Sequence, residues 1–369
     1  MARKLQSDKW LFLATLALIC ASVVMVYSAS ALVALEKFQQ PYMFVTKQIM
    51  FAAVGIAVVS VIMRVDYRTY RDDRFIWGLL GLVAVMLVAV LFARPVNGTR
   101  RWVAMGGFGI QPSEMAKLAA ILFTALILER RRHRINELSY ALLPIGIIVG
   151  GLTGLILLEP DFGTAVSLLA ATGVMVFAAG VSYRYLFGTL LLALPTLYVV
   201  LIQAEYRRRR LLIFMDPWSD PLGDGFQIIQ SLIAVGTGGV FGKGLMNGVQ
   251  KLFYLPEPHT DFIYSVIAEE TGLIGASVVL LCFCVIAWRG MRAALRAPDS
   301  FGAFLALGIT MMLVLQAFVN ISVVLGLMPT KGIPLPLVSS GGSSLLINLL
   351  GVGVLLNISQ HAHEETGAA

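Results

Sequence analysis

Long apolar runs constrain this chain more than any other feature of its sequence. A helix needs about 20 consecutive apolar residues to cross a bilayer. We identify ten such segments, at about 10–29, 46–63, 76–93, 113–128, 140–158, 163–180, 185–202, 263–288, 301–325 and 342–358. Only 13% of the 369 residues are charged, against about 25% in soluble proteins. The sequence predicts an all-α polytopic membrane protein, with residues 1–369 forming a single membrane domain.

The positions of Lys and Arg predict how the chain is oriented. Positive residues concentrate in the cytoplasmic links of membrane proteins. The N-terminus and the even-numbered links hold fifteen Lys and Arg residues, whereas the short odd-numbered links hold six. Both termini are therefore predicted to be cytoplasmic, and the net charge of +7 reflects orientation and anionic lipid rather than nucleic acid.

The link between the seventh and eighth segments, residues 203–262, is predicted to be a long extracytoplasmic loop and not a separate domain. A loop of this length is usually functional. Its stretch 226–240 is too short and glycine-rich to span, and is predicted to lie in the interface or to re-enter the membrane. Four consecutive arginines in this loop either contact lipid headgroups or recognise a phosphorylated lipid: Arg207, Arg208, Arg209 and Arg210.

Polar clusters occur at the outward ends of the predicted helices, and no ATP-binding loop, GxGxxG, HExxH or nucleophile elbow is present. Glu114 and Lys117 stand three residues apart in an apolar segment, so they share a helix face. They form either an ion pair that joins helices or a charge network beside a site. Glu159 and Asp161 occupy a tight turn, and turn formation alone does not require both acids.

Asp261 precedes the apolar segment that contains Glu269 and Glu270. A helix cap is the ordinary explanation for an Asp in this place. Acids at a membrane boundary are nevertheless candidates for function, so both interpretations of Asp261 remain open, and Glu269 and Glu270 have no assigned role.

The stretch 326–344 is rich in proline and glycine and also contains Lys331, Ser339 and Ser343. Irregular backbone at membrane depth is tolerated where it packs on protein or lines a cavity. The stretch is either a kinked connector or part of a site. Because all these clusters are predicted on the outward side, they favour one polar cavity there.

Five motifs together resemble the SEDS proteins of shape, elongation, division and sporulation over almost the whole chain. They are "GTRRWVAMGGFGIQPSEMAKLA", "EPDFGT", "YRRRRLLIFMDPWSDPLGDGFQIIQSLIAVGTGGVFGKGL", "LPEPHTDFIYSVIAEETG" and "MPTKGIPLPLVSSGGSS". The "PTKG" at 329–332 is more similar to the division branch, FtsW, than to the elongation branch, RodA. Two positions depart from the residues frequent in the family: Ser340 stands in place of tyrosine and Glu159 in place of glutamine.

The resemblance implies a peptidoglycan glycosyltransferase that polymerises lipid II in the bacterial cytoplasmic membrane, during division or elongation. It implies a class B penicillin-binding protein as partner, with other divisome or elongasome membrane proteins, and a divalent ion such as Mg²⁺ or Mn²⁺. The family's catalytic aspartate matches Asp261, its ion-paired helix residues match Glu114 and Lys117, and its last outward lysine matches Lys331.

On this basis Asp261 is the expected general base. Asp161 is expected to support the site, Ser339 and Ser343 to bind substrate, and Arg207–Arg210, Lys331 or a metal ion to stabilise the pyrophosphate. Two alternatives are a lipid II flippase and a non-catalytic divisome scaffold. A flippase would need a charged path to the cytoplasmic leaflet.

Overall fold

The structure is a computed structural model. It describes residues 7–93, 100–105, 108–185, 187–188, 191, 195, 198, 205–329 and 332–362, with side chains at all of these except 104, 105, 108 and 205–207.

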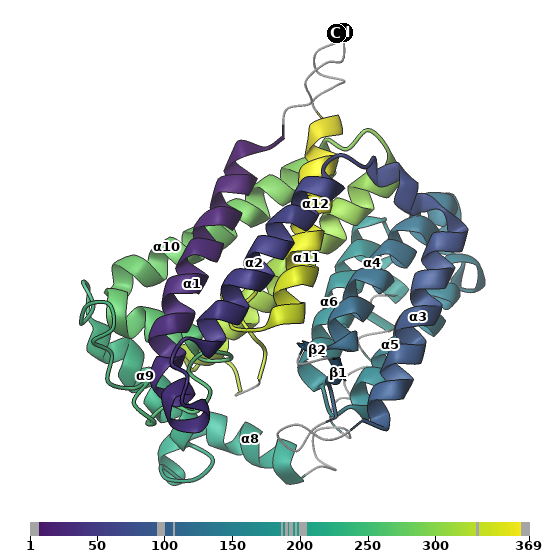
Figure 1. Cartoon of the computed structure of the whole chain (residues 1–369). Helices are drawn as coiled ribbons and strands as arrows, with labels where there is room; N and C mark the ends of the chain where they lie inside the picture. Colours follow the sequence, from purple (N-terminus) through teal and green to yellow (C-terminus); the bar gives the residue numbers. More distant parts are fainter. Residues whose placement is uncertain are drawn as a thin grey trace, which may run out of the picture.

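Long helices run side by side through the molecule (Figure 1). They are α1 (Lys9–Phe38), α2 (Met43–Ile62), α3 (Asp73–Leu91), α4 (Pro112–Arg131), α5 (Leu143–Leu158), α6 (Phe162–Ala178), α10 (Ile263–Leu295), α11 (Ser300–Val324) and α12 (Gly342–His361). Nine predicted segments coincide with these described helices, and the seventh, 185–202, lies mostly outside the described residues. Among the described residues, seven helices are long and apolar enough to cross a membrane. The prediction of an all-α polytopic membrane protein is confirmed.

Shorter elements connect the long helices. They are η1 (Tyr67–Arg71), η2 (Arg132–Arg134), the single π-turn η3 (Leu138–Leu142), α8 (Glu205–Met215), η4 (Pro217–Ser219) and α9 (Phe226–Gly238). The link before α4 also contains a small antiparallel hairpin of β1 (Val103–Met105) and β2 (Phe108–Ile110), with Val103 opposite Ile110. The sequence did not predict this hairpin, because three-residue strands leave almost no periodic signal.

Aspartates begin several of these helices. Asp8 accepts the backbone N–H groups of Trp10 and Leu11 at the start of α1, and Asp299 accepts that of Gly302 at the start of α11. A carboxylate here satisfies backbone donors that the helix leaves unpaired. These polar residues therefore set the helix starts at the membrane boundary.

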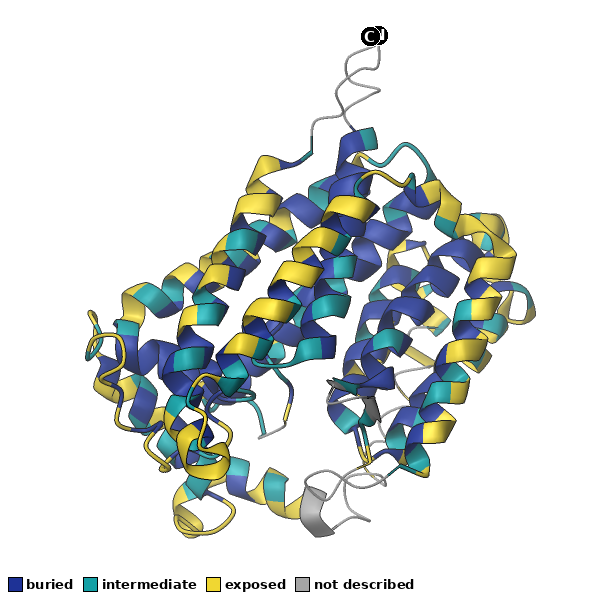
Figure 2. Ribbon diagram, viewed as in Figure 1, coloured by how far each residue is buried: buried dark blue, intermediate teal, exposed yellow. Residues whose placement is uncertain are grey.

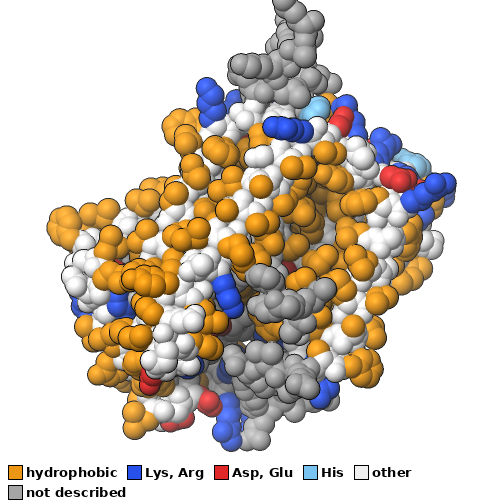
Figure 3. All heavy atoms as spheres, viewed as in Figure 1, with side chains coloured by type: hydrophobic (Ala, Val, Ile, Leu, Met, Phe, Trp, Pro, Cys, Tyr) orange, Lys and Arg blue, Asp and Glu red, His pale blue; other side chains and the backbone are white. Residues whose placement is uncertain are grey.

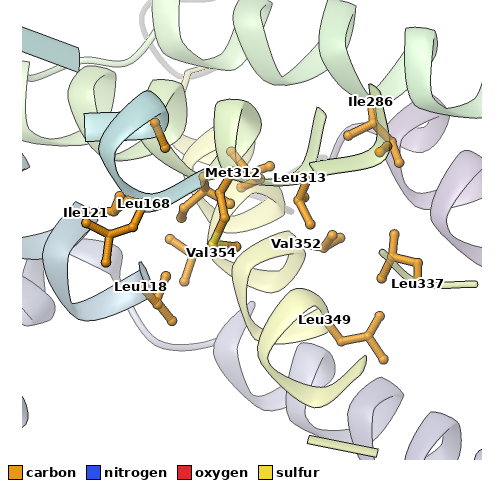
Figure 4. Packing of buried hydrophobic residues seen from close by; sticks show 14 of the residues in the cluster. Leu118, Ile121, Leu168, Ile286, Met312, Leu313, Leu337, Leu349, Val352 and Val354 are labelled. Carbon is orange, nitrogen blue, oxygen red and sulfur yellow. The ribbon is translucent and has the colours of Figure 1, made fainter. Parts of the chain in front are cut away.

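Three helices, α4, α11 and α12, form the centre of the bundle. Most of their residues are buried, whereas α2 and α3 expose apolar side chains along their outer faces (Figure 2). Figure 4 shows how Leu118 and Ile121 of α4, Met312 of α11 and Val354 of α12 contribute to one apolar core. Polar side chains on α4, α11 and α12 are consequently screened from lipid by the surrounding helices.

The N-terminal segment and the even-numbered links, which are rich in Lys and Arg, lie at one end of the bundle. Arg68 of η1 pairs with Asp299 before α11 at 3.1 Å, and Arg71 pairs with Glu129 of α4 at 3.0 Å. Asp8 at the start of α1 pairs with Arg289 near the end of α10. Charged and histidine side chains gather at this end in Figure 3, above sides covered by hydrophobic atoms. We call it the arginine end.

Candidate active site

The opposite end of the bundle holds Asp261, the turn at 159–161, hairpin β1–β2 and the loop 332–341. We call it the site end. Phe262, and not Asp261, occupies the N-cap position of α10, so the helix-cap interpretation of Asp261 is wrong. The backbone carbonyl of Asp261 instead accepts a hydrogen bond from Asn320 Nδ2 at 2.8 Å. The same amide donates to the carbonyl of Ile333 at 2.7 Å, so α11 joins Asp261 to the loop 332–341.

The Asp261 carboxyl faces the loop at Gly332. A Cβ atom at position 332 would lie 2.7 Å from Asp261 Oδ2, so glycine leaves the room that this carboxyl occupies. Burial raises the pKa of Asp261 to about 7, and the negative charges of Glu257 and Asp161 add to the rise. The positive charges of Arg101 and Arg210 lower this pKa. Asp261 can therefore exchange a proton near neutral pH, as a general base does.

Arg101 holds the turn that carries the second pair of acids. Its guanidinium donates to the carbonyl of Pro160 at 2.6 Å and to that of Glu159 at 3.4 Å. It lies 4.0 Å from Asp161 Oδ1. Arg101 therefore connects the hairpin link with the turn between α5 and α6.

Asp161 is almost fully buried and bonded on every side. It caps α6 by accepting the N–H and hydroxyl of Thr164, at 3.2 and 2.7 Å. Its Oδ2 atom also accepts from Gln111 Nε2 at 3.1 Å and from Ser113 Oγ at 3.4 Å. The structure therefore shows Asp161 joining α6 to the start of α4, a geometry that fits a supporting role.

Glu159 is different from Asp161. Its side chain is fully buried, and neither carboxyl oxygen has a hydrogen-bond partner among the described residues. The pKa of Glu159 is raised to about 8, mainly by burial and also by the nearby Asp161, against the opposing effect of Arg101. At neutral pH Glu159 is mainly a neutral carboxylic acid.

The loop 332–341 is held by side chains of α1, α2 and α11 and by its own Ser339. Ser339 Oγ donates to the carbonyl of Thr260 at 2.6 Å and accepts from the Leu335 N–H at 2.7 Å. Ser343 Oγ accepts from the Gln111 N–H at 3.2 Å. Both serines are buried. Ser339 holds the loop and Ser343 joins the start of α12 to Gln111 before α4, and their contact with substrate stays a prediction.

Glu114 and Lys117 share one face of α4, as predicted, with Nζ and Oε2 3.0 Å apart and both side chains buried. Lys117 also donates to Gln316 Oε1 at 2.6 Å, and Gln316 Nε2 donates to the carbonyl of Pro334 at 3.0 Å. Glu114 accepts from Ser344 Oγ at 3.3 Å. The pair therefore connects α4 to the loop 332–341 through Gln316 and to the start of α12 through Ser344, and its role beside a site stays a prediction.

The predicted cations of the site differ in how far the structure describes them. Arg208, Arg209 and Arg210 belong to α8, which runs crosswise below the bundle in Figure 1. The positive charge of Arg210 lowers the pKa of Asp261. The side chain of Arg207 and the whole of Lys331 lie outside the described residues.

The described residues do not build a metal site by themselves. In this part of the chain, no three His, Cys, Asp or Glu side chains converge as metal ligands. The oxygens of Asp161 are occupied by hydrogen bonds, and the backbone carbonyl of Glu159 accepts from the Arg101 guanidinium. The donor set does not fit a resident divalent ion.

Several residues of the site were missed by sequence reasoning. Gln111, Gln316 and Asn320 are buried amides that join α4 and α11 to the irregular segments. Gln316 and Asn320 stand four residues apart, on one face of an otherwise apolar segment. That spacing was the available signal, because paired polar residues within a membrane helix seldom face lipid.

Comparison with known proteins agrees with this geometry. The family model FTSW_RODA_SPOVE, described as cell cycle protein, matches residues 9–364. A probable peptidoglycan glycosyltransferase FtsW of Geobacter metallireducens is 44% identical over 354 residues, covering 95% of this chain and 94% of the relative. Stage V sporulation protein E of Bacillus subtilis is 43% identical over 366 residues, covering 98% and 99%.

Solved structures are similar along almost the whole chain. One, from work on polymerisation and crosslinking by a peptidoglycan synthase complex, is 31% identical with a TM-score of 0.79, covering 98% of this chain and 99% of that one. The rod shape determining protein RodA of Thermus thermophilus is 27% identical with a TM-score of 0.72, with the same coverage. The chain belongs to the FtsW, RodA and SpoVE family, the SEDS proteins.

Proposed function

We propose that this protein is a peptidoglycan glycosyltransferase that polymerises lipid II, with Asp261 as general base. The observation that carries the proposal is the Asp261 carboxyl at the site end, with a pKa of about 7 and with Arg101 and Arg210 near enough to influence it. Relatives named as probable glycosyltransferases of this kind support it.

The proposed reaction joins two lipid-linked disaccharides. The 4-hydroxyl of the acceptor N-acetylglucosamine attacks the anomeric carbon of the donor N-acetylmuramic acid. Asp261 takes the hydroxyl proton as the new glycosidic bond forms, a role that contributes about 10²–10⁴-fold. The bond from the anomeric carbon to pyrophosphate breaks, and undecaprenyl pyrophosphate leaves.

The leaving pyrophosphate gains negative charge, which nearby cations stabilise. Arg101 and Arg210 both lower the pKa of Asp261 through their positive charge. We propose that these two residues bind the pyrophosphate together with the other arginines of α8 and Lys331. Mg²⁺ is commonly bound by one or two carboxylates plus substrate phosphates. A divalent ion is therefore proposed only as a companion of the substrate, and no step depends on it.

Substitution of Asp261 tests the function. Asp261→Asn keeps the size of the side chain but cannot accept the proton, so polymerisation of lipid II by the purified protein with its partner should fall at least 100-fold. Asp224→Asn is the matched control, because Asp224 is an exposed acid of the same outer segment. Glycan chains formed at the normal rate by Asp261→Asn would contradict the assignment.

A flippase is supported less well by the described residues. The buried polar side chains around Asp261 connect loops at the site end, whereas the arginine end is joined by ion pairs such as Arg68–Asp299 and Asp8–Arg289. A charged path between the two ends is what a flippase would need. An assay that measures translocation of lipid II separately from polymerisation discriminates the two functions.

We further propose that the protein works with a class B penicillin-binding protein, the transpeptidase that crosslinks its product, and with other divisome or elongasome membrane proteins. The similarity to a chain from a peptidoglycan synthase complex supports this partner. The FtsW relatives favour division over elongation. Addition of the purified partner to the polymerisation assay should raise the rate.

A further inference from the structure

The helix α10 contains two buried acids, Glu269 and Glu270, that the proposed reaction does not use. Glu269 and Glu270 have no side-chain exposure, and they precede Gly272, where α10 has non-helical backbone with φ 67°. Acids inside a membrane helix are costly unless they are paired and bonded. Their partners therefore show what the chain gains by placing them there.

Every partner of these two acids lies in the long outer loop or in α1. Glu269 accepts from Lys243 Nζ at 2.8 Å and from the Val249 N–H at 2.9 Å. Glu270 accepts from Lys251 Nζ at 2.6 Å, from Ser28 Oγ at 2.6 Å and from the Met246 N–H at 3.0 Å. We call this set the Glu269–Glu270 network, formed by Ser28, Lys243, Lys251, Glu269 and Glu270.

The break in α10 is filled by the backbone of the same loop. The carbonyls of Glu269 and Glu270 accept the N–H groups of Lys243 and Gly244, each at 3.0 Å. After the break, the N–H of Leu273 donates to the carbonyl of Gly239 at 2.9 Å. The loop thus satisfies backbone groups that a broken helix leaves unpaired.

Glycine permits this close approach. Gly242 has φ 78°, and a Cβ atom there would lie 2.2 Å from the carbonyl oxygen of Glu270. Gly272 has φ 67°, and its Cβ would lie 2.3 Å from the Gly242 backbone nitrogen. The loop is therefore fixed to α10 by backbone contact, by hydrogen bonds, by the buried Lys251–Glu270 ion pair and by the partly exposed Lys243–Glu269 ion pair.

The fixed segment leads directly to Asp261. Lys251 is held to α10 and α1, and the chain then runs ten residues to Asp261, where Ser339 and Asn320 hold its other side. A general base must be placed within hydrogen-bond reach of the proton that it removes. Small displacements of such a group cost large factors in rate.

We propose that the Glu269–Glu270 network positions Asp261 for its reaction with substrate. Glu269 and Glu270 are positioning residues, because they act through the loop and do not touch substrate. The proposal rests on the proposed glycosyltransferase function, and it gives a role to two acids that the sequence left unexplained.

Two variants and a control test the proposal. Glu270→Gln keeps the size of the side chain, replaces one acceptor oxygen with an NH₂ donor, and leaves Lys251 as a buried charge without its counter-charge. The double variant Glu270→Gln/Lys251→Met removes both charges, so its Tm should recover relative to the single variant. Asp8→Asn is the control, because Asp8–Arg289 is also a buried ion pair between α1 and α10, at the arginine end.

Hydrogen exchange measures how firmly the segment 243–262 is held, and it does not depend on activity. In Glu270→Gln and in the double variant, amides in 243–262 should exchange at least tenfold faster than in the wild type, and in Asp8→Asn they should not. Unchanged exchange in both network variants would overturn the proposal. This measurement stands even if the wild type forms no glycan, an outcome that contradicts the proposed function instead.

Polymerisation then separates positioning from stability. If the network positions Asp261, the double variant should polymerise lipid II at least tenfold more slowly than the wild type, although its Tm recovers. The pH at which its rate is half-maximal should also be lower than in the wild type. That pH shift follows because water reaching Asp261 reduces the burial that raises its pKa, while Glu257, Asp161, Arg101 and Arg210 remain. A double variant with the wild-type rate would show a purely structural role and overturn the proposal.

Discussion

At the scale of single residues, Asp261 combines properties that oppose each other. Burial makes its carboxylate costly, and that cost gives the carboxylate the proton affinity of a base that works near neutral pH. Arg101 and Arg210 limit the rise of the pKa to about 7. A more exposed aspartate would be ionised throughout the useful pH range but would bind the proton too weakly.

The rate of polymerisation should therefore depend on the ionisation of Asp261. A base with a pKa of about 7 is active when deprotonated, so the rate should fall as pH drops below about 7. Arg101→Gln removes a charge that lowers this pKa, so the pH of half-maximal rate should rise. A fall of that pH in Arg101→Gln would contradict the electrostatic coupling.

Glu159 makes a prediction about stability and not about rate. Its folded pKa of about 8 lies above the ordinary Glu value of about 4.3, so its contribution to stability is lost as pH rises between the two values. Glu159→Gln removes this loss. The Tm of the variant minus that of the wild type should grow from pH 5 to pH 8, whereas Glu137→Gln, at an exposed ion pair, should show no such trend. A flat difference for Glu159→Gln would show that the acid is ionised in the folded protein.

At the scale of elements, the buried polar residues of α4 and α11 act as connectors between helices and irregular segments. Glu114 and Lys117 were predictable as a pair from their spacing alone. The partners of Gln316, which are Lys117 and the carbonyl of Pro334, were not predictable, because they meet it only after α11 packs against α4 and the loop. Side-chain partners from distant segments are decided by packing and not by local pattern.

Breaking the Glu114–Lys117 pair should cost more than removing it. Lys117→Met leaves Glu114 buried without its cation, which destabilises proteins by about 3–5 kcal/mol. Glu114→Leu/Lys117→Met removes both charges and should have a higher Tm than Lys117→Met alone, measured on purified protein in detergent. A double variant less stable than Lys117→Met would mean that Lys117 does not offset the cost of burying the Glu114 charge.

At the scale of the whole molecule, ion pairs and hydrogen bonds divide the links into two groups. Links with many arginines meet at the arginine end, and links with glycine, proline and acids meet at the site end. The positive-inside rule assigns the arginine end to the cytoplasm. The site end would then face the compartment in which the cell wall is built.

Thiol labelling tests this orientation. In a variant with Cys20, Cys282 and Cys284 replaced by Ser, the exposed positions Ser219 and His133 can each be changed to Cys. A membrane-impermeant maleimide added to intact spheroplasts should label Ser219→Cys, and it should label His133→Cys only after permeabilisation. The reverse pattern would invert the proposed topology.

The sequence by itself determined the membrane class, the course of the described spanning helices and the grouping of links. These features depend on hydrophobic length and charge, which are local properties of the chain. It also indicated Asp261 and the Glu114–Lys117 pair. Binding of substrate by Ser339 and Ser343 stays a prediction, and their buried bonds to Thr260 and Gln111 were not visible in the sequence.

Only the tertiary structure decided how Asp261 is held and what surrounds it. Asp261 is surrounded by three segments that lie far apart along the chain. Asn320 of α11 donates a hydrogen bond to its carbonyl, Gly332 of the last loop leaves room for its carboxyl, and Asp161 before α6 raises its pKa. Glu269 and Glu270 acquire partners because a glycine-rich loop packs into the break of α10. A buried charge is stabilised by the groups that the fold brings to it, and no local pattern names those groups.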